Sequence, residues 1–146
     1  MMVEETDVLT TPRDYIRWGA SRFEEAGLFY GHGTDNAVDE ATLLVLPALH
    51  LPSDLAVGYL NARLTVSERA EVLDLLQRRV DERLPAAYLM GTTRFAGLDF
   101  YVNRYVLIPR SPIAELIEST FEPWIQPDTV ERVLDWCTAS GCIATR

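Results

Sequence analysis

The first part of the chain repeats apolar residues at the spacing of amphipathic helices. Residues 11–14, Thr-Pro-Arg-Asp, predict a helix start, because a hydroxyl N-cap, a proline at the first helical position and an early acid favour one. Ile16, Ala20 and Phe23 follow at helical spacing. Gly27 is expected to end this helix, since glycine adopts the left-handed conformation easily.

A second helix is predicted over residues 38–49, after a polar, glycine-containing loop at residues 30–36. Asp39 and Glu40 lie near its positive end, where acids are favoured. Pro47 removes a backbone donor, so a kink or an early end is expected there. The apolar residues cover more than one face, which predicts a central helix; they are Leu43, Leu44, Leu46 and Leu49.

A third helix begins at residues 65–68, Thr-Val-Ser-Glu, which match a capping box. Arg78, Arg79 and Arg83 lie near its negative end and are expected to form a solvated face that complements the helix dipole. Pro85 is expected to stop or kink the helix. One apolar stripe is predicted to face the core: Val72, Leu73, Leu76, Val80 and Leu84.

After a short predicted helical turn at residues 85–90, the apolar residues no longer follow helical spacing, and the sequence takes on the pattern of strands. Residues 94–95 and 99–102 are predicted to pair as a β-hairpin around a turn at Ala96 and Gly97. Residues 106–108 form a short apolar strand or extended segment that ends at a proline.

The last part of the chain is expected to open an α/β arrangement. Ser111 and Pro112 predict another helix start, with Ile113, Leu116, Ile117 and Phe121 on its buried face. Residues 130–136 are predicted as a buried strand carrying Val133 and Leu134. If that strand has no neighbours, its backbone needs other partners, so we expect it to be disordered or to pair with a second copy.

Size and charge narrow the classes of function. The 146 residues suffice for one domain, or for a small domain and a piece of another. The net charge of -9 disfavours direct nucleic-acid binding. It either attracts a basic partner, such as a ribosomal protein, or only keeps the protein soluble. No apolar run approaches the roughly 20 residues of a membrane span, and the acidic start lacks a secretory signal, so a cytoplasmic location is expected.

Few residues are suited to bind a metal. Cys137 and Cys142 are interpreted as reduced packing residues, with no further ligands nearby for a zinc site. His32 is interpreted as a loop residue held by local hydrogen bonds, with a substrate contact as the alternative. The aromatic residues of the first helix serve either the core or recognition: Tyr15, Trp18 and Phe23.

The block at residues 134–144 carries the candidate chemistry. Ala139, Ser140 and Gly141 are small enough for a sharp turn and for close approach of the backbone to a ligand. Asp135, at the end of the predicted strand, can hold a polar or cationic group. Taken alone, the block favours a plain tight turn, because an acid followed by small residues is common in turns.

The block resembles motif I of the class I S-adenosylmethionine-dependent methyltransferases, which have a Rossmann-like fold. The closer resemblance is to the glutamine methyltransferases of release factors and ribosomal proteins. Residues 30–36, 85–89 and 106–117 resemble the ribosomal-protein branch, because Ser111, Pro112 and Ile113 stand where release-factor enzymes have an acid and a threonine. The resemblance extends in order from about Thr11 over nearly the whole chain.

The resemblance implies a domain order. Residues 1–90 correspond to a mainly α, helical substrate-recognition domain, and residues 91–108 to a β-hairpin connector. Residues 109–146 correspond to the truncated start of a Rossmann-like α/β domain that binds S-adenosylmethionine. A fragment of this kind is expected to self-associate through its unpaired C-terminal strand.

The resemblance also implies methyl transfer from S-adenosylmethionine to the side-chain amide nitrogen of a glutamine, in the third protein of the large ribosomal subunit. The family's Asn-Pro-Pro-Tyr segment is absent, so no catalytic residue is assigned and the chain itself is expected to be inactive. The alternative is a non-catalytic helical module that binds a basic ribosomal protein or a release factor. The cofactor-binding residues implied are Asp135, Thr138, Ser140, Gly141, Arg110 and Ser111.

Three residues in these blocks are open to more than one interpretation. Ala139 stands where the family usually has glycine, so it is strained by about 1 kcal/mol if the position needs a positive φ and is tolerated if only small size matters. Arg110 and Ser111 either shape the cofactor pocket or form a helix cap beside an exposed arginine.

Overall fold

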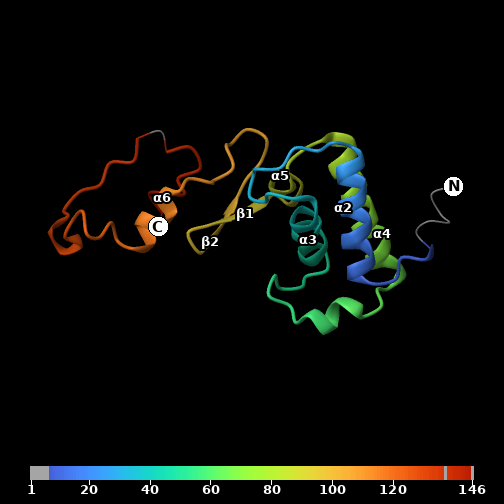
Figure 1. Cartoon of the computed structure of the whole chain (residues 1–146). Helices are drawn as coiled ribbons and strands as arrows, with labels where there is room; N and C mark the ends of the chain where they lie inside the picture. Colours follow the sequence, from blue (N-terminus) through green and yellow to red (C-terminus); the bar gives the residue numbers. More distant parts are fainter. Residues whose placement is uncertain (1–6, 137, 146) are drawn as a thin grey trace. The chain divides into compact units, whose positions relative to one another are not determined.

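The computed structural model describes residues 7–136 and 138–145. The chain divides into two compact units, Met1–Leu89 and Met90–Arg146. The first unit is helical, and the second contains a two-stranded antiparallel sheet, one short α-helix and long irregular segments (Figure 1).

Three helices form the core of the first unit. They are α2 (Pro12–Glu25), α3 (Ala37–Ala48) and α4 (Val66–Glu82), and each packs against the other two (Figure 1). A 3₁₀ helix, η1 (Val57–Asn61), precedes α4, and the short α5 (Ala86–Met90) follows it. The side chains with least exposure come from all three long helices: Tyr15, Phe23, Leu44, Val45, Val72 and Leu76.

The predicted start and end of α2 are confirmed. The Thr11 hydroxyl accepts a hydrogen bond from the Asp14 amide at 3.2 Å, and the Asp14 carboxylate accepts one from the Thr11 amide at 2.9 Å. Gly27 follows the C-cap with φ of 57°, a conformation that costs glycine little. The capping box therefore satisfies backbone donors that have no partner within the helix.

The Asp14 carboxylate should make this cap pH-dependent. Burial raises its pKa, but hydrogen bonds from Thr10 and Thr11 outweigh that effect and hold the pKa below its ordinary value of 3.8. The stabilisation is therefore present above about pH 4 and is lost as pH falls through the folded-state pKa. We expect Asp14→Asn to lower the free energy of unfolding by about 1 kcal/mol at pH 7 and by much less near pH 3.

Urea unfolding at the two pH values measures this difference. Asp74→Asn is the matched control, because Asp74 is an exposed acid of α4, where substitutions stay within about 0.5 kcal/mol. An equal loss of stability in both variants at pH 7 would contradict the role assigned to the Asp14 carboxylate.

The second predicted helix is also confirmed as the central one. Leu44 and Val45 of α3 have no measurable exposure. Asn36 caps its N-terminus, since its side-chain oxygen accepts a hydrogen bond from the Asp39 amide at 2.9 Å. The helix contains Pro47 and ends at Ala48, one residue before the predicted end at Leu49, so the proline does not shorten it appreciably.

The expectation of a solvated arginine run on α4 is wrong for Arg79. Arg78 is exposed and pairs with Glu82 at 2.8 Å, as a surface residue does. Arg79 is only 2% exposed, and its Nε donates to Oε1 of Glu40 at 2.8 Å. Arg79 lies three positions after the buried Leu76, so the helical period turns it toward the core, where a carboxylate from α3 compensates its charge.

Glu40 and Arg79 together connect four segments of the helical unit. The Glu40 carboxylate also accepts hydrogen bonds from the Thr34 hydroxyl and, at 3.3 Å, from the Ala86 amide. Arg79 Nη2 donates to the carbonyl oxygen of Phe29 at 3.2 Å. The buried pair thereby ties the loop before α3 to α3, α4 and the start of α5.

Arg83 has a tertiary role as well. It is the C-cap residue of α4 in the left-handed conformation, and it remains exposed as predicted. Its guanidinium donates to the carbonyl oxygens of Ala26 and Gly27 at 3.0 and 2.9 Å. A cation therefore complements the negative end of α2, a neighbouring helix.

The hairpin of the second unit is confirmed. Strands β1 (Thr92–Phe95) and β2 (Leu98–Tyr101) pair antiparallel. Ala96 and Gly97 form the turn with φ of 45° and 78°, and positive values at both positions match the twist of the strands. Residues 106–108 are irregular, with Ile108 buried.

The helix predicted after Ser111 and Pro112 is α6 (Ile113–Glu118), but its buried face is smaller than predicted. Ile113 and Ile117 pack against a cluster of Phe95, Ala96 and Cys142, whereas Leu116 is 38% exposed. A six-residue helix presents little more than one turn of side chains to a neighbour, so only part of the predicted face is covered.

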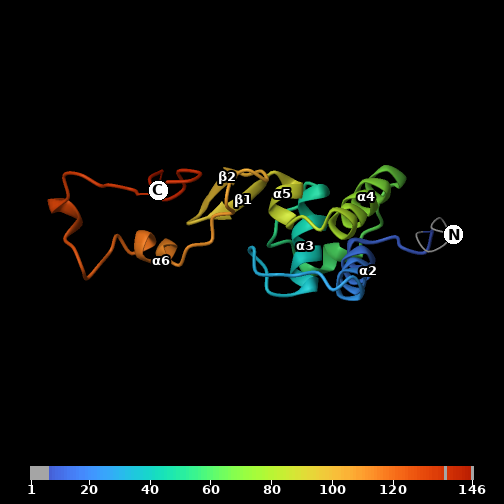
Figure 2. The same cartoon turned by 90° about the horizontal axis from the view of Figure 1, so that it is seen from above.

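The predicted buried strand at residues 130–136 is wrong. These residues are irregular, and Val133 and Leu134 are 83% and 81% exposed. A strand forms where neighbouring strands satisfy its backbone groups, and the β1–β2 hairpin is the only sheet in the described residues. The chain beyond α6 passes through the 3₁₀ helix η2 (Pro127–Thr129) as an irregular path (Figure 2). In the described part of the chain, the C-terminal strand through which self-association was expected is therefore absent.

Candidate functional site

Residues 135–136 and 138–145 form a series of tight turns. The Thr138 hydroxyl donates to the carbonyl oxygen of Asp135 at 2.9 Å, and the Gly141 amide donates to that of Thr138 at 2.7 Å. The Thr145 amide then donates to the Gly141 carbonyl at 3.0 Å, which closes one helix-like turn. Cys137 lies outside the described residues. Local hydrogen bonds therefore define a compact loop from small and hydroxyl-bearing residues.

The backbone of this loop is left-handed at two positions. Ala139 has φ of 47° and Gly141 has φ of 76°. Glycine adopts this region at no steric cost, but the Cβ of alanine crowds the following carbonyl, at about 1 kcal/mol or more. Ala139 therefore fits the first of its two interpretations, in which a positive φ strains the residue.

Ala139→Gly is therefore expected to stabilise the second unit by about 1 kcal/mol, despite the greater freedom of glycine in the unfolded chain. Thermal unfolding, followed by a spectroscopic signal that reports on the second unit, measures the change in its stability. Ala144→Gly is the control, because Ala144 is also exposed and does not have a positive φ. This control should lower stability slightly, and a gain of equal size in both variants would contradict the assigned strain.

Two polar side-chain atoms in the loop lack partners. Asp135 Oδ2 and Ser140 Oγ are buried and have no hydrogen-bond partner in the described residues. Leaving such an atom unsatisfied costs about 1–3 kcal/mol, so native structures rarely retain one without a reason. A carboxylate oxygen and a hydroxyl can receive and donate hydrogen bonds to a ligand that carries an ammonium and hydroxyl groups. S-adenosylmethionine carries such groups, so these residues fit the cofactor that the resemblance implies.

The loop is held by apolar contacts at its C-terminal end. Cys142 is a free thiol, 8% exposed, and joins the cluster with Phe95 and Ala96, as a packing cysteine would. Ile143 packs against the same cluster, as do Ile113 and other residues of α6. The loop is thus attached to α6 and to the hairpin within one compact unit.

Arg110 and Ser111 precede α6 and are both exposed. The Ser111 hydroxyl accepts a hydrogen bond from the Ile113 amide at 3.3 Å, which is a helix-start contact. Since α6 packs on the cluster that holds Cys142, this helix start belongs to the same unit as the loop. The cofactor-binding role of Arg110 and Ser111 stays a prediction, as do those of Asp135, Thr138, Ser140 and Gly141.

The described residues hold no group of three or more potential metal ligands. Nor do they include a helix of sufficient length and apolar character to cross a membrane. The His32 ring lies edge-on to the Phe29 ring, with centroids 5.8 Å apart. Tyr15 and Phe23 are 1% and 0% exposed, so for these two aromatic residues the core interpretation is correct.

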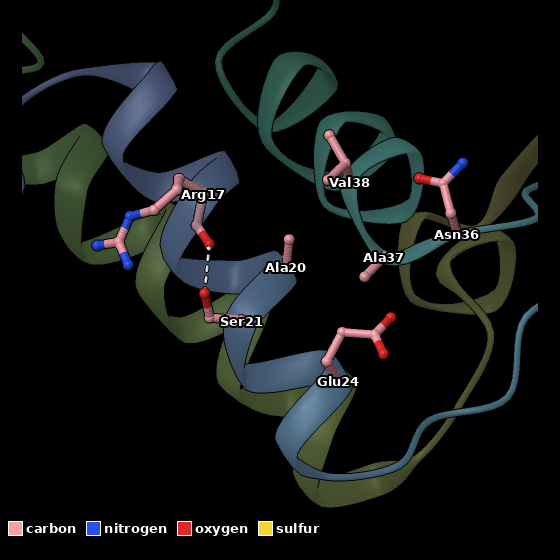
Figure 3. A pocket seen from close by; sticks show the side chains of 7 residues that line it. All are labelled: Arg17, Ala20, Ser21, Glu24, Asn36, Ala37 and Val38. Carbon is pink, nitrogen blue, oxygen red and sulfur yellow. Dashed lines mark hydrogen bonds between the residues drawn. The ribbon is translucent and has the colours of Figure 1, made fainter.

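Sequence reasoning missed two features of the helical unit. One is the buried Glu40–Arg79 pair, and the other is a hollow between α2 and α3, lined at its base by Ala20 and Ala37 (Figure 3). The signal for the hollow was alanine on the facing sides of two neighbouring helices. That signal is weak until the packing of the helices is known.

Comparison with family models finds no match, but curated proteins match nearly the whole chain. A protein of Xanthomonas campestris is 59% identical over 144 residues, covering 99% of this chain and 47% of its own length. One of Bordetella pertussis is 55% identical over 137 residues, with coverage of 93% and 46%. One of Neisseria meningitidis serogroup A is 50% identical over 145 residues, with coverage of 99% and 48%.

These curated homologues are ribosomal protein uL3 glutamine methyltransferases. The predicted resemblance to the ribosomal-protein branch of the glutamine methyltransferases is thereby confirmed. The chain spans about half the length of the curated relatives it matches.

Proposed function

We propose that this chain is part of an enzyme that transfers a methyl group from S-adenosylmethionine to the side-chain amide nitrogen of a glutamine in uL3. The observation that carries this proposal is the identity of 50–59% over nearly the whole chain with relatives of that name. The buried, unpartnered oxygens of Asp135 and Ser140 support a cofactor site in the loop.

The chemistry sets a clear requirement for such a site. An amide nitrogen is a poor nucleophile because its lone pair is delocalised, so the rate depends on positioning and on electrostatic stabilisation. S-adenosylmethionine supplies the methyl group when bound. The amide nitrogen forms a bond to the methyl carbon while the bond between that carbon and the sulfonium sulfur breaks, which leaves S-adenosylhomocysteine, and the nitrogen loses one proton to solvent. In this chain, Asp135 and Ser140 would orient the cofactor through their buried oxygens, while the left-handed turn brings the backbone close to it.

We assign the two units different tasks in this cytoplasmic enzyme. Residues 1–90 recognise the protein substrate, since their helices form a core of their own. Residues 91–108, whose hairpin lies in the second unit, form the connector between the recognition domain and the cofactor-binding domain. Residues 109–146 contribute the start of a Rossmann-like α/β domain that binds S-adenosylmethionine.

The 146-residue chain alone is proposed to lack methyltransferase activity. It contains no Asn-Pro-Pro-Tyr, the segment that in the resembled family holds the amide next to the methyl group. We expect calorimetry with S-adenosylmethionine to detect no tight binding by this chain. A micromolar dissociation constant would contradict this proposal.

The function is tested with a protein in which this sequence is followed by an Asn-Pro-Pro-Tyr-containing domain. Incubation with radiolabelled S-adenosylmethionine and purified uL3 should label a glutamine side chain of uL3. Asp135→Ala should reduce the labelling strongly, whereas Asp128→Ala, which changes an exposed acid before the loop, should not. Labelling of a release factor and not of uL3 would overturn the proposed substrate.

A second candidate function is a non-catalytic module that binds a basic protein. The acidic balance of the chain and the separate core of the helical unit favour it. Retention of uL3 by the 146-residue chain, together with the absence of any labelling by the longer protein, would support this candidate over the enzyme.

A further inference from the structure

A hollow of about 570 Å³ lies between α2 and α3 in the helical unit (Figure 3). It exists because the facing residues of the two helices, Ala20 and Ala37, have small side chains and are themselves buried. Val38, 55% exposed, stands on the α3 side of the hollow. Ser21 and Glu24 of α2 stand on the opposite side, and both are exposed. The floor is therefore apolar and the rim polar.

The charged groups at the rim do not all face the hollow. Figure 3 shows the carboxylate of Glu24 directed toward α3, whereas the guanidinium of Arg17 is directed away from it. Arg17 therefore contributes its aliphatic stem and backbone, and its carbonyl oxygen accepts a hydrogen bond from the Ser21 hydroxyl at 3.1 Å. Glu24 forms no ion pair in the part of the chain described.

The surroundings of Glu24 are also negative. The Tyr30 hydroxyl adjoins Glu24, because burial and then the Glu24 carboxylate raise its pKa above 10.0, and it adds no positive charge there. Asp35 and Asp39 lie in the adjoining loop and in the first turn of α3, and both are exposed. Residues 7–89 contain thirteen acids and eight arginines, so the helical unit carries a negative balance beyond the hollow itself.

We propose that this hollow receives an arginine or lysine side chain from a basic segment of a protein partner. The aliphatic stem of that side chain would lie on Ala20, Ala37 and Val38, and its cationic head would meet the Glu24 carboxylate. Long basic side chains bind in this way, with the stem on apolar surface and the charge at a polar rim. The identity of the partner as uL3 rests on the proposed function, but the positive charge of the occupant does not.

Other occupants fit the hollow less well. Small-molecule sites enclose most of their ligand, whereas five of the residues that line this hollow are exposed: Arg17, Ser21, Glu24, Asn36 and Val38. A nucleic acid is disfavoured because the carboxylate at the rim and the acidic balance repel phosphates. A segment of a larger protein covers such a surface with neighbouring contacts, and a basic residue complements the single charge that faces the hollow.

The test uses the 146-residue chain with two probes, purified uL3 and a synthetic peptide of alternating arginine and leucine. Binding of each is measured by titration calorimetry at two salt concentrations. Glu24→Gln keeps the shape of the side chain and removes its charge, so it should weaken both interactions by about tenfold and reduce their salt dependence. Glu25→Gln is the matched control, since Glu25 is the adjacent acid, pairs with Arg22 at 2.7 Å and lies outside the hollow.

A second pair of variants tests the apolar part of the hollow. Ser21→Phe places a large side chain in it from an exposed position, and should weaken binding by about tenfold without loss of the fold. Ser67→Phe makes the same change at an exposed position of α4 and should leave binding unchanged. In NMR spectra of the isotope-labelled chain, addition of the arginine–leucine peptide should shift the amide signals of Ala20, Ala37 and Val38.

The results separate this inference from the proposed function. If the chain binds uL3 but Glu24→Gln and Ser21→Phe bind as well as the unaltered chain, the hollow is not the docking site, whatever the longer protein methylates. If neither probe binds, or if a peptide with glutamate in place of arginine binds equally well, the inference is also overturned. Loss of peptide binding in both variants but not in their controls supports the hollow even if uL3 proves not to be methylated.

Discussion

Replacing Arg79 with methionine is expected to lower the free energy of unfolding of the helical unit by about 3–5 kcal/mol. The substitution leaves the Glu40 carboxylate, 5% exposed, without its cation in the core. It also removes the hydrogen bond to the Phe29 carbonyl, so the loop before α3 loses one of its attachments. Urea unfolding followed by far-ultraviolet circular dichroism measures the loss.

Two further variants separate charge burial from helix propensity. Arg78→Met makes the same change one residue earlier, where the guanidinium is exposed and pairs with Glu82, so it should cost at most about 0.5 kcal/mol. The double variant Arg79→Met with Glu40→Leu removes both charges and should recover part of the stability. Equal losses in the Arg78 and Arg79 variants would show that the buried pair is not what makes position 79 sensitive.

Phe23→Ala is expected to destabilise the same unit by about 3–5 kcal/mol. The Phe23 side chain has no measurable exposure, so its removal leaves a cavity in addition to the lost burial of the ring. The Arg79 guanidinium lies 5.9 Å from the centre of the Phe23 ring, and this cation–π contact is lost as well. The midpoint and slope of urea unfolding report the change.

The control for Phe23 is Phe29→Ala, because Phe29 is 74% exposed and its substitution should cost about 0.5 kcal/mol or less. Since Phe23 and Arg79 are in contact, the losses from Phe23→Ala and Arg79→Met should not add when combined. Strict additivity would indicate that the guanidinium and the ring act independently.

The first unit was the more predictable part of the chain, for a local reason. The capping boxes at Thr11 and Thr65 and the stop at Gly27 act within a few residues of the helix they bound. The same holds for the hairpin turn at Ala96 and Gly97, where two residues determine the reversal of the chain. Short-range interactions of this kind can be predicted from the sequence because both partners lie within a few residues of each other.

The candidate site was predictable in its composition but not in its conformation. The small residues around Gly141 indicated a tight turn, and the turn is present. The backbone conformation of Ala139 depends on the contacts that anchor the loop. These contacts are the packing of Cys142 and Ile143 against Phe95 and α6. The contact with Phe95 spans more than forty residues of sequence and those with α6 more than twenty, so no local pattern contains them.

By itself, the sequence determined the positions of the long helices, the hairpin and the resemblance of its blocks to glutamine methyltransferases, because periodicity, caps and motifs are local. Tertiary structure alone decided that Arg79 is buried, since Glu40 approaches from another helix and compensates its charge. It also decided that residues 130–136 remain irregular, since β structure depends on neighbouring strands. The hollow beside Glu24 likewise appears only when α2 and α3 pack, because two alanines leave space only when they face each other.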